Sequence, residues 1–500
     1  MSKLGILIPT AAVAALVAAG LAAWTARAVL AQTPKAPSKS LPTAVPPPQA
    51  CFHPPFDRLC PDIPHDITET FQAGYSQLGA AQQRPFDNFA WQMFVALNWP
   101  ADERGRPREG PFRDHPNAPR LWESYPSPFS LLGRALPGEN KPPRELLQEG
   151  VGGARHVFTM FATRSNPKDL KPGSILQAGS AKPLIDRHLN FVVYDVRVNP
   201  TEFDFIRKSN LNTQAGQETY LKTQGASVAW PLGSYADDNT KTGGVVGSIE
   251  LKTAWRIFDP EKEPGAERRY YTVDGVMVVD KEHSQNGQPL RIRARFGLIG
   301  FHIIQRTTGP KGQAQDWIWA TFEHVDNAPT ATNAREPTDI SLPLPTEGTA
   351  PDQVDRPYTF FNPAYKGPTN TLPDLPDGEV YQWGPKPPYA AKYALDGKYG
   401  TQVVRCWKIY PPTAEVSRYF RRLLRGTVWE NYELIGCQWQ GGVENPTLEN
   451  GNIPRYLANT TLETYVQLQS YGSCLDCHSG SPTSVPGLSG NFSHLLMRGE

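Results

Sequence analysis

A Cys-x-x-Cys-His sequence near the end of the chain constrains the fold more than any other feature. Cys474, Cys477 and His478 belong to a chain of 500 residues. Two thiols one helical turn apart can add to the two vinyl groups of a haem, and the next imidazole then lies beneath the iron as its proximal ligand. Only about forty residues surround this motif, too few for a core of their own. We therefore expect the C-terminal segment to pack against the main body of the protein.

The same three residues have two other chemical interpretations. A Cys-x-x-Cys pair can be a thiol redox couple or one half of a zinc site. The chain contains neither a second Cys-x-x-Cys nor a His-x-x-x-His that would complete a zinc site. We therefore predict one covalent haem c, attached through Cys474 and Cys477, with His478 as an axial ligand of the iron.

The first residues of the chain predict export. Lys3 precedes an apolar run over residues 4–24, and residues 29–31 offer a cleavage site that ends in a small residue. Residues 1–31 are therefore interpreted as a signal peptide, with an uncleaved N-terminal anchor as the alternative, because the run approaches membrane-spanning length. Haem attachment to a Cys-x-x-Cys-His motif takes place outside the cytoplasm in bacteria. The two features together predict a periplasmic protein.

The four remaining cysteines are expected to form two disulfides. Cys51, Cys60, Cys406 and Cys437 are an even number of thiols in an oxidising compartment. A Cys51–Cys60 bond would close a short proline-containing loop. Cys406 and Cys437 lie on apolar, aromatic stretches that we expect to be neighbouring strands. The alternative is that one or both pairs stay reduced and buried.

The balance of charge limits the classes of partner. The chain has 50 basic and 49 acidic residues and a net charge of +1, without a block of Lys or Arg. Clustered basic residues are the usual basis for binding nucleic acid or anionic lipid. We therefore expect no nucleic-acid partner, and membrane contact only through an uncleaved N-terminal anchor. The 50 prolines and 42 glycines indicate a loop-rich protein, not a helical bundle.

Proline-rich stretches suggest how the chain is divided. Residues 32–66 are predicted to be a tether. Residues 67–340 are interpreted as a β-rich main domain, and residues 341–390 as a proline-rich crossing. The remaining residues, 391–500, form the predicted haem c-binding region.

Sequence periodicity predicts an α+β fold with a large antiparallel β portion and peripheral helices. No helix-length segment separates the predicted strands over residues 249–256, 269–279, 290–305 and 317–325, so we expect them to pair antiparallel. Met93 lies on the apolar face of a predicted helix and is assigned to the core. Further strands are expected over residues 190–198, 402–409 and 432–439, helices over residues 86–97, 202–209 and 416–425, and loops over residues 105–179.

Few residues are available for the distal side of the haem iron. Met497 follows the motif, and His302 and His324 lie on predicted strands. If these two strands form a hairpin centred on residue 311, strand alternation places His302 and His324 on one face, where either could be a distal ligand or a proton donor. Alternation sends Glu323 to the opposite face from His324. The alternatives are a core role for His302, a strand-end network with Asp326 for His324, and packing at the chain end for Met497.

Several blocks of the sequence are similar to one family. These blocks are residues 91–100, 250–252, 300–303, 321–327, 429–439 and 457–493. From residue 86 to the C-terminus, the chain resembles uncharacterised single-haem cytochrome c family proteins of proteobacteria. The resemblance implies covalent haem at Cys474 and Cys477 with His478 as axial ligand, but it fixes neither a substrate nor a distal ligand. His494 stands where an aromatic residue is expected, which argues against iron ligation by His494.

Taken together, these features predict a periplasmic carrier of single electrons. Its partner would be a redox protein or a small electron donor or acceptor. One alternative is a haem enzyme of the peroxidase or oxidase type, with an open distal site and catalytic residues that the sequence leaves unidentified. Another is a haem-based sensor or binding module. Several hundred residues beyond the size of a small cytochrome indicate an additional pocket, a partner surface or a shielded haem.

Overall fold

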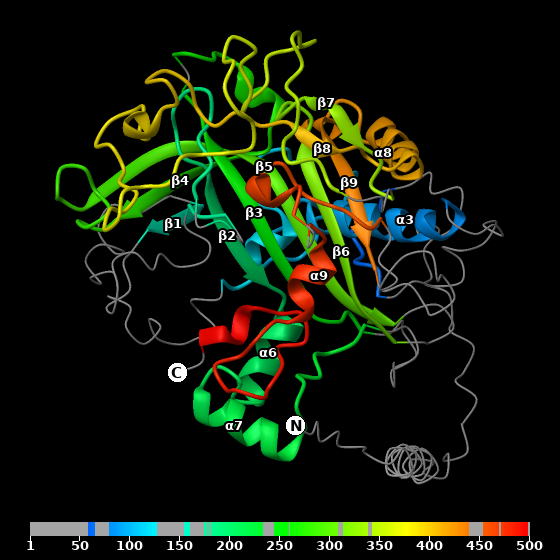
Figure 1. The fold of residues 1–500 in the computed structure, drawn as a ribbon. Coiled ribbons are helices and arrows are strands. Elements are labelled where there is room, and N and C mark those ends of the chain that lie inside the picture. Colours follow the sequence, from blue (N-terminus) through cyan, green and yellow to red (C-terminus); the bar gives the residue numbers. More distant parts are fainter. Residues whose placement is uncertain are drawn as a thin grey trace, which may run out of the picture. The chain divides into compact units, whose positions relative to one another are not determined.

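The computed structural model is organised around its longest strand, β5 (Leu290–Thr308) (Figure 1). One edge of β5 pairs first with β4 (Thr272–Val279) and then with β6 (Ala314–His324). The other edge pairs with β3 (Ile249–Ile257). All three pairings are antiparallel, as predicted. Because one edge of β5 serves two partners in succession, the sheet divides into two branches on that side.

The structure describes most of the chain from residue 59 onward. The described residues are 59–65, 80–127, 155–160, 175–177, 180, 182–233, 245–259, 261–308, 314–338, 343–439, 454–469 and 472–498. All of them belong to one unit, residues 46–500. The leader predicted for residues 1–31 and most of the predicted tether lie outside them. None of the helices formed by the described residues is both long and apolar enough to span a bilayer.

The remaining strands complete the main sheet and form a second, smaller one. β2 (Val193–Val198) pairs antiparallel with β3, and β9 (Tyr432–Gln438) pairs antiparallel with β6. β1 (His156–Met160) pairs parallel with β4. β7 (Thr330–Arg335) and β8 (Arg405–Trp407) form a separate parallel pair. The two parallel pairings were not predicted, because β1 lies in a region interpreted as loops and no strand was expected over the residues of β7.

Among the described residues, five α-helices accompany the sheet, and the predicted α+β class with peripheral helices is confirmed. They are α3 (Ala80–Leu97), α6 (Pro200–Lys208), α7 (Gln214–Thr223), α8 (Pro411–Leu423) and α9 (Cys474–Ser479). The start of α6 is fixed by the side chain of Asn199, which accepts a hydrogen bond from the backbone of Glu202, and by Pro200 in its first turn. Short 3₁₀ helices cover Leu121–Ser124, Ala266–Arg269, Ala391–Tyr393, Val428–Asn431, Thr464–Val466 and Leu495–Arg498.

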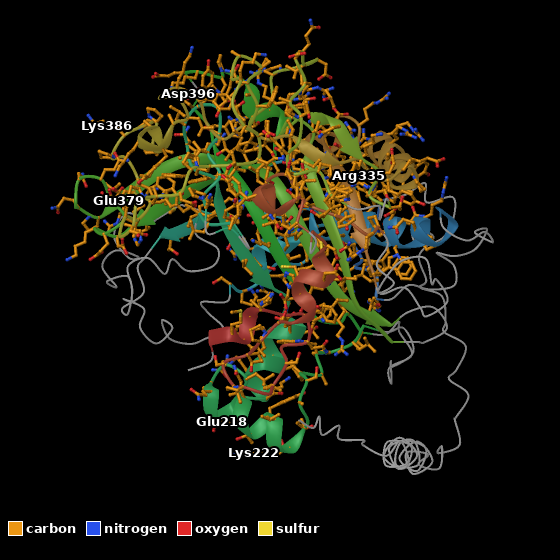
Figure 2. The ribbon with its side chains drawn as sticks, viewed as in Figure 1. Glu218, Lys222, Arg335, Glu379, Lys386 and Asp396 are labelled. Carbon is orange, nitrogen blue, oxygen red and sulfur yellow. The ribbon has the colours of Figure 1, made fainter. Side chains whose placement is uncertain are left out.

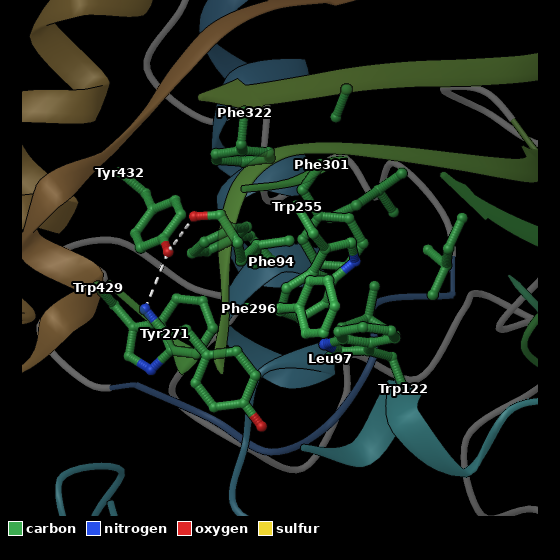
Figure 3. Packing of buried hydrophobic residues seen from close by; sticks show 14 of the residues in the cluster. Phe94, Leu97, Trp122, Trp255, Tyr271, Phe296, Phe301, Phe322, Trp429 and Tyr432 are labelled. Atoms are coloured by element: carbon green, nitrogen blue, oxygen red, sulfur yellow. Dashed lines mark hydrogen bonds between the residues drawn. The ribbon is translucent and has the colours of Figure 1, made fainter. Parts of the chain in front are cut away.

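The large aromatic core lies between α3 and one face of the sheet (Figure 3). Phe94 on α3 stacks on Phe322 of β6, with ring centroids 4.2 Å apart. One turn earlier on α3, Trp91 stacks on Phe420 of α8 at 5.3 Å. The predicted helix is therefore confirmed, but it is buried on more than one face because α8 covers it. Met93 is fully buried in this cluster, which confirms its assignment to the core.

Charged side chains lie at the periphery of the sheet and helices (Figure 2). Glu218 and Lys222, on α7, project from the end of the molecule near the C-terminal segment. The polar groups that matter for the site are therefore those that the sheet and the C-terminal segment bury between them.

The predicted Cys406–Cys437 disulfide is wrong. Both thiols are free and buried. β8, which carries Cys406, pairs with β7, whereas β9, which carries Cys437, pairs with β6 in the main sheet. The two cysteines therefore lie on strands that are not neighbours, and the reduced, buried alternative holds for this pair. Cys60 is buried and disulfide-bonded. Its predicted partner, Cys51, lies outside the described residues, so the pairing of Cys60 with Cys51 stays a prediction.

Candidate haem-binding site

The face of the sheet opposite the aromatic core carries the candidate site; we call it the outer face. Its residues follow from the strand register, because side chains alternate between the two faces along each strand. One row of paired residues crosses β2, β3, β5, β6 and β9, and the next row lies beside it. The first row is Val196, Lys252, His302, Thr321 and Gly436, and the second is Val198, Glu250, Ile304, Trp319 and Gln438.

Helix α9 lies against the second of these rows (Figure 1). Ser473 caps the helix by accepting a hydrogen bond from the backbone of Asp476 at 3.2 Å. The backbone of Leu475 donates to the side-chain oxygen of Gln438 at 3.3 Å, and the Leu475 side chain is buried. Asp476 also forms a partly buried ion pair with Arg455. These contacts confirm that the C-terminal segment packs against the β portion.

The two cysteines of the motif occupy successive turns of α9. Both thiols are free; Cys477 is exposed and Cys474 is half-buried. Burial raises the pKa of both thiols, with the neighbouring Glu463 as a further cause. A reactive redox pair has at least one thiol with a lowered pKa. Neither Cys474 nor Cys477 therefore has the lowered pKa that is typical of a thiol–disulfide exchange pair.

His478 is held in one tautomer. Its Nδ1 lies 2.8 Å from the carbonyl oxygen of Phe492 and donates its hydrogen to it. Burial, followed by the nearby His494, lowers the pKa of His478 to about 3, so the ring is neutral at physiological pH. A neutral imidazole whose Nδ1 carries the hydrogen has its lone pair on Nε2, which is the arrangement of a metal-ligating histidine. His478 therefore fits an iron ligand through Nε2.

Two aromatic rings lie beside the imidazole of His478, and Met497 was a candidate to approach it. The ring of Trp319 lies 4.2 Å from that of His478, and the ring of His494 lies 4.5 Å away. Met497 is 46 % exposed, and its sulfur contacts Nδ1 of His494 at 3.2 Å. Met497 thus contacts His494 at the chain end, where the sequence alternative placed it.

His302 lies on the outer face, in the row next to that of Trp319. Its Nε2 is 2.7 Å from a carboxylate oxygen of Glu463, and Lys252 is its direct neighbour across β3 and β5. Burial acts to raise the pKa of Glu463, but His302 and then Lys252 lower it overall, so Glu463 is ionised. In the neutral imidazole, donation of the Nε2 hydrogen to Glu463 leaves the lone pair on Nδ1.

Glu463 and Lys252 were not predicted as site residues. Glu463 belongs to an irregular segment, where no periodic pattern of residues distinguishes it. It is separated from its partner, His302, by 161 positions in the sequence. Lys252 lies on a strand whose alternation is visible in the sequence, but its proximity to the motif depends on how the C-terminal segment crosses the sheet. No local signal could have found either residue.

The prediction that His302 and His324 share a face is wrong. The register of β5 and β6 shifts by one residue between Arg306 and Thr307, so His302 pairs with Thr321. His324 therefore faces away from His302, because side chains alternate along β6. The bulge near the hairpin turn is the physical reason for the difference.

His324 and Glu323 both have structural partners. The ring of His324 stacks on Tyr270 at 3.7 Å, its Nε2 donates to the Arg269 carbonyl at 3.0 Å, and its Nδ1 accepts from the Asp326 backbone at 3.2 Å. Burial lowers the pKa of His324 to about 3. Glu323 is buried on the other face in an ion pair with Arg405 at 2.8 Å. The strand-end interpretation of His324 thus accounts for both ring nitrogens.

Comparison with known proteins gives no independent assignment of this site. The chain matches no protein-family model, and the searches of curated proteins and of solved structures return no match.

Proposed function

We propose that this protein is a c-type cytochrome that transfers single electrons in the periplasm. Cys474 and Cys477 would hold one haem by thioether bonds, and Nε2 of His478 would bind its iron. A haem bound there would supply an iron that alternates between the ferric and ferrous states. The partner would be a redox protein or a small electron donor or acceptor, and the family resembled by the sequence supports the same proposal.

The hydrogen bond from His478 to the Phe492 carbonyl carries this proposal. It fixes the imidazole plane and the tautomer before any ligand binds, so the protein loses little entropy on binding iron. The Phe492 carbonyl lies outside the Cys-x-x-Cys-His motif, and the rest of the C-terminal segment holds it in place.

His302 is the residue that we assign to the distal side. Of the three candidates, His324 faces the opposite side of the sheet and Met497 contacts His494. His302 lies on the outer face, and its bond to Glu463 leaves Nδ1 as the nitrogen with a lone pair. A carboxylate bound to the second ring nitrogen is also the usual support of a metal-ligating histidine.

A second candidate function, a haem enzyme acting on peroxide or a small oxidisable molecule, is supported by the same pair. An imidazole hydrogen-bonded to an ionised carboxylate, as His302 is to Glu463, can accept a proton through Nδ1. In that case His302 would exchange protons with a substrate and would not bind the iron. The carrier and the enzyme therefore differ in whether His302 is a ligand.

Optical spectroscopy of the full chain, produced with cytochrome c maturation machinery, tests both proposals. For the carrier we expect low-spin spectra and haem that stays with the polypeptide after denaturing extraction. Cys474→Ala and Cys477→Ala should each lose one thioether bond, whereas Cys406→Ala, a free buried cysteine outside the motif, should keep both. The absence of covalent haem in the unmodified protein would refute the carrier and the enzyme alike.

Variants at two histidines separate the two functions. His302→Ala should convert low-spin haem to high-spin haem if His302 is a ligand, and His324→Ala should leave the spin state unchanged. High-spin haem in the unmodified protein, with peroxide turnover that His302→Ala abolishes, would favour the enzyme. An unchanged low-spin spectrum in His302→Ala would exclude His302 as the distal ligand.

A further inference from the structure

Two buried carboxyl groups face each other beneath the C-terminal segment. Glu202, on α6, is fully buried, and Glu250, on the outer face of β3, is 8 % exposed. The two side chains hydrogen-bond each other. Apart from this mutual contact, neither carboxyl oxygen of Glu202 nor Oε1 of Glu250 has a hydrogen-bond partner among the described residues. Because an ionised carboxylate can only accept, a hydrogen bond between two carboxyl groups requires a proton between them.

The pair is connected to His478 through two consecutive residues. The side chain of Ser493 hydrogen-bonds Glu250. The residue before it, Phe492, supplies the carbonyl oxygen that holds Nδ1 of His478 at 2.8 Å. The carbonyl of Phe492 and the nitrogen of Ser493 belong to one peptide group. A change of charge at the acid pair can therefore reach the Phe492 carbonyl through the Ser493 side chain and the Phe492–Ser493 peptide group. This carbonyl orients the imidazole of His478.

The surroundings of the pair favour its protonated form over its fully ionised form. Burial raises the pKa of Glu202 well above its ordinary value, with Glu250 as the next cause, and burial likewise raises the pKa of Glu250. No cation neutralises the pair: among the described residues, neither glutamate forms an ion pair with Lys, Arg or His. Two carboxyl groups in such a site cannot both ionise near neutral pH.

Other titratable and charged groups lie on the elements packed around the pair. Lys252 follows on β3, His478 and His494 lie in the C-terminal segment, and Arg306 on β5 donates to the Trp230 carbonyl. Burial lowers the pKa of Lys252 and of His494. On α6, the charged groups are the exposed Asp204, Arg207 and Lys208.

We propose that Glu202 and Glu250 form a proton-binding site whose occupancy is linked to electron transfer at His478. This inference rests on the proposed function. For each electron that a one-electron donor would deliver to a haem iron held by His478, the pair would take one proton from solvent. In the oxidised state the two carboxyl groups share one proton. After reduction both would be neutral carboxylic acids, and the added proton would balance the charge of the added electron. Added negative charge at the iron raises the proton affinity of nearby carboxyl groups, which is the physical origin of the link.

The test is the reduction potential of the holoprotein as a function of pH. We expect the potential to fall as pH rises between about pH 5 and 9, because reduction is then accompanied by proton uptake. One proton per electron is a tenfold change in the equilibrium per pH unit, at most about 59 mV for a one-electron couple. Glu202→Gln and Glu250→Gln should each flatten this dependence. Asp204→Asn, which removes an exposed carboxylate from the same helix, should leave it unchanged.

A second measurement needs no variant. Infrared difference spectra between the reduced and oxidised wild-type protein should show the C=O stretch of a protonated carboxylic acid, gained on reduction. A potential independent of pH in a protein with covalent haem would overturn this inference and leave the proposed function standing. An unchanged slope in both glutamine variants, or equal flattening in Asp204→Asn, would also overturn it. Absence of covalent haem, seen in the denaturing extraction, would refute the proposed function itself and the linkage with it.

Discussion

The indole ring of Trp319 and the imidazole ring of His478 lie 4.2 Å apart, centroid to centroid. Trp319 is held on β6, whereas His478 ends the motif more than 150 positions later in the chain. The sheet therefore supports His478 directly, and the Phe492 carbonyl fixes the orientation of its ring.

Removal of this indole should weaken the site and the fold together. Trp319 is almost fully buried, so Trp319→Ala should lower the free energy of unfolding by about 3 kcal/mol. We also expect a smaller fraction of the chain to retain haem after maturation, because His478 loses its packing surface. Urea unfolding and the haem-to-protein absorbance ratio measure the two effects, and Trp319→Phe is the matched control with a smaller loss. Unchanged stability in Trp319→Ala would contradict the packing role.

The buried ion pair between Glu323 and Arg405 should be strongly coupled. Glu323 is fully buried, and its carboxylate lies 2.8 Å from the guanidinium of Arg405. Glu323→Gln leaves the Arg405 charge without its partner and should cost about 3 kcal/mol of stability. The double variant Glu323→Gln/Arg405→Met should cost less than the sum of the two single changes. Additive losses in this double-mutant cycle, measured by denaturant unfolding, would exclude the coupling.

The free thiols of Cys406 and Cys437 should be detectable without any reductant. Both side chains are buried, so a thiol reagent should label neither in the native protein and both after unfolding. Mass spectrometry of the labelled peptides identifies the two sites, and the Cys406→Ala variant should lose one label. If neither cysteine reacts in the unfolded, unreduced chain, the two thiols are oxidised and the structural assignment is wrong.

Stability should depend on pH through His156. This buried imidazole lies 3.1 Å from Glu123 and 3.6 Å from Asp195. Burial alone would lower its pKa, but hydrogen bonds and charge interactions with Asp195 and Glu123 raise it overall above 6.5. The stabilisation is therefore fully present below about pH 6.5 and is lost as pH rises through the raised pKa of the folded state.

The matched variant for this effect is His156→Gln, which keeps a polar side chain and removes the titration. The free energy of unfolding of the unmodified protein should fall between about pH 6.5 and 9, and that of the variant should not show this fall. Denaturant unfolding at a series of pH values measures both. Equal pH dependence in the two proteins would show that His156 does not stay protonated in the fold.

Much of the secondary structure could be predicted because it depends on neighbouring residues. Alternation from Ile249 onward marks β3, and the apolar spacing from Phe86 to Leu97 marks α3. β1 and β7 were missed, and the strand predicted over residues 402–409 is only the three residues of β8, because a strand of a few residues shows no period and is fixed by its partner. The parallel pairing of β1 with β4 joins residues that no local pattern relates.

The sequence by itself determined the spacing on which the haem proposal rests. The spacing of Cys474, Cys477 and His478 is set by the geometry of one helical turn, so it could be recognised without a fold. It also determined that His302 and Glu323 lie on strands, because alternation is local.

Only the tertiary structure decided which side chains meet the motif. A one-residue shift between Arg306 and Thr307 exchanges the faces of the residues beyond it, and this removes His324 from the face of His302. The contacts of Glu463 with His302 and of Glu250 with Glu202 and Ser493 join segments that are distant in sequence. The physical reason is that such contacts depend on where the C-terminal segment crosses the sheet, and the buried surface of the whole fold sets that path.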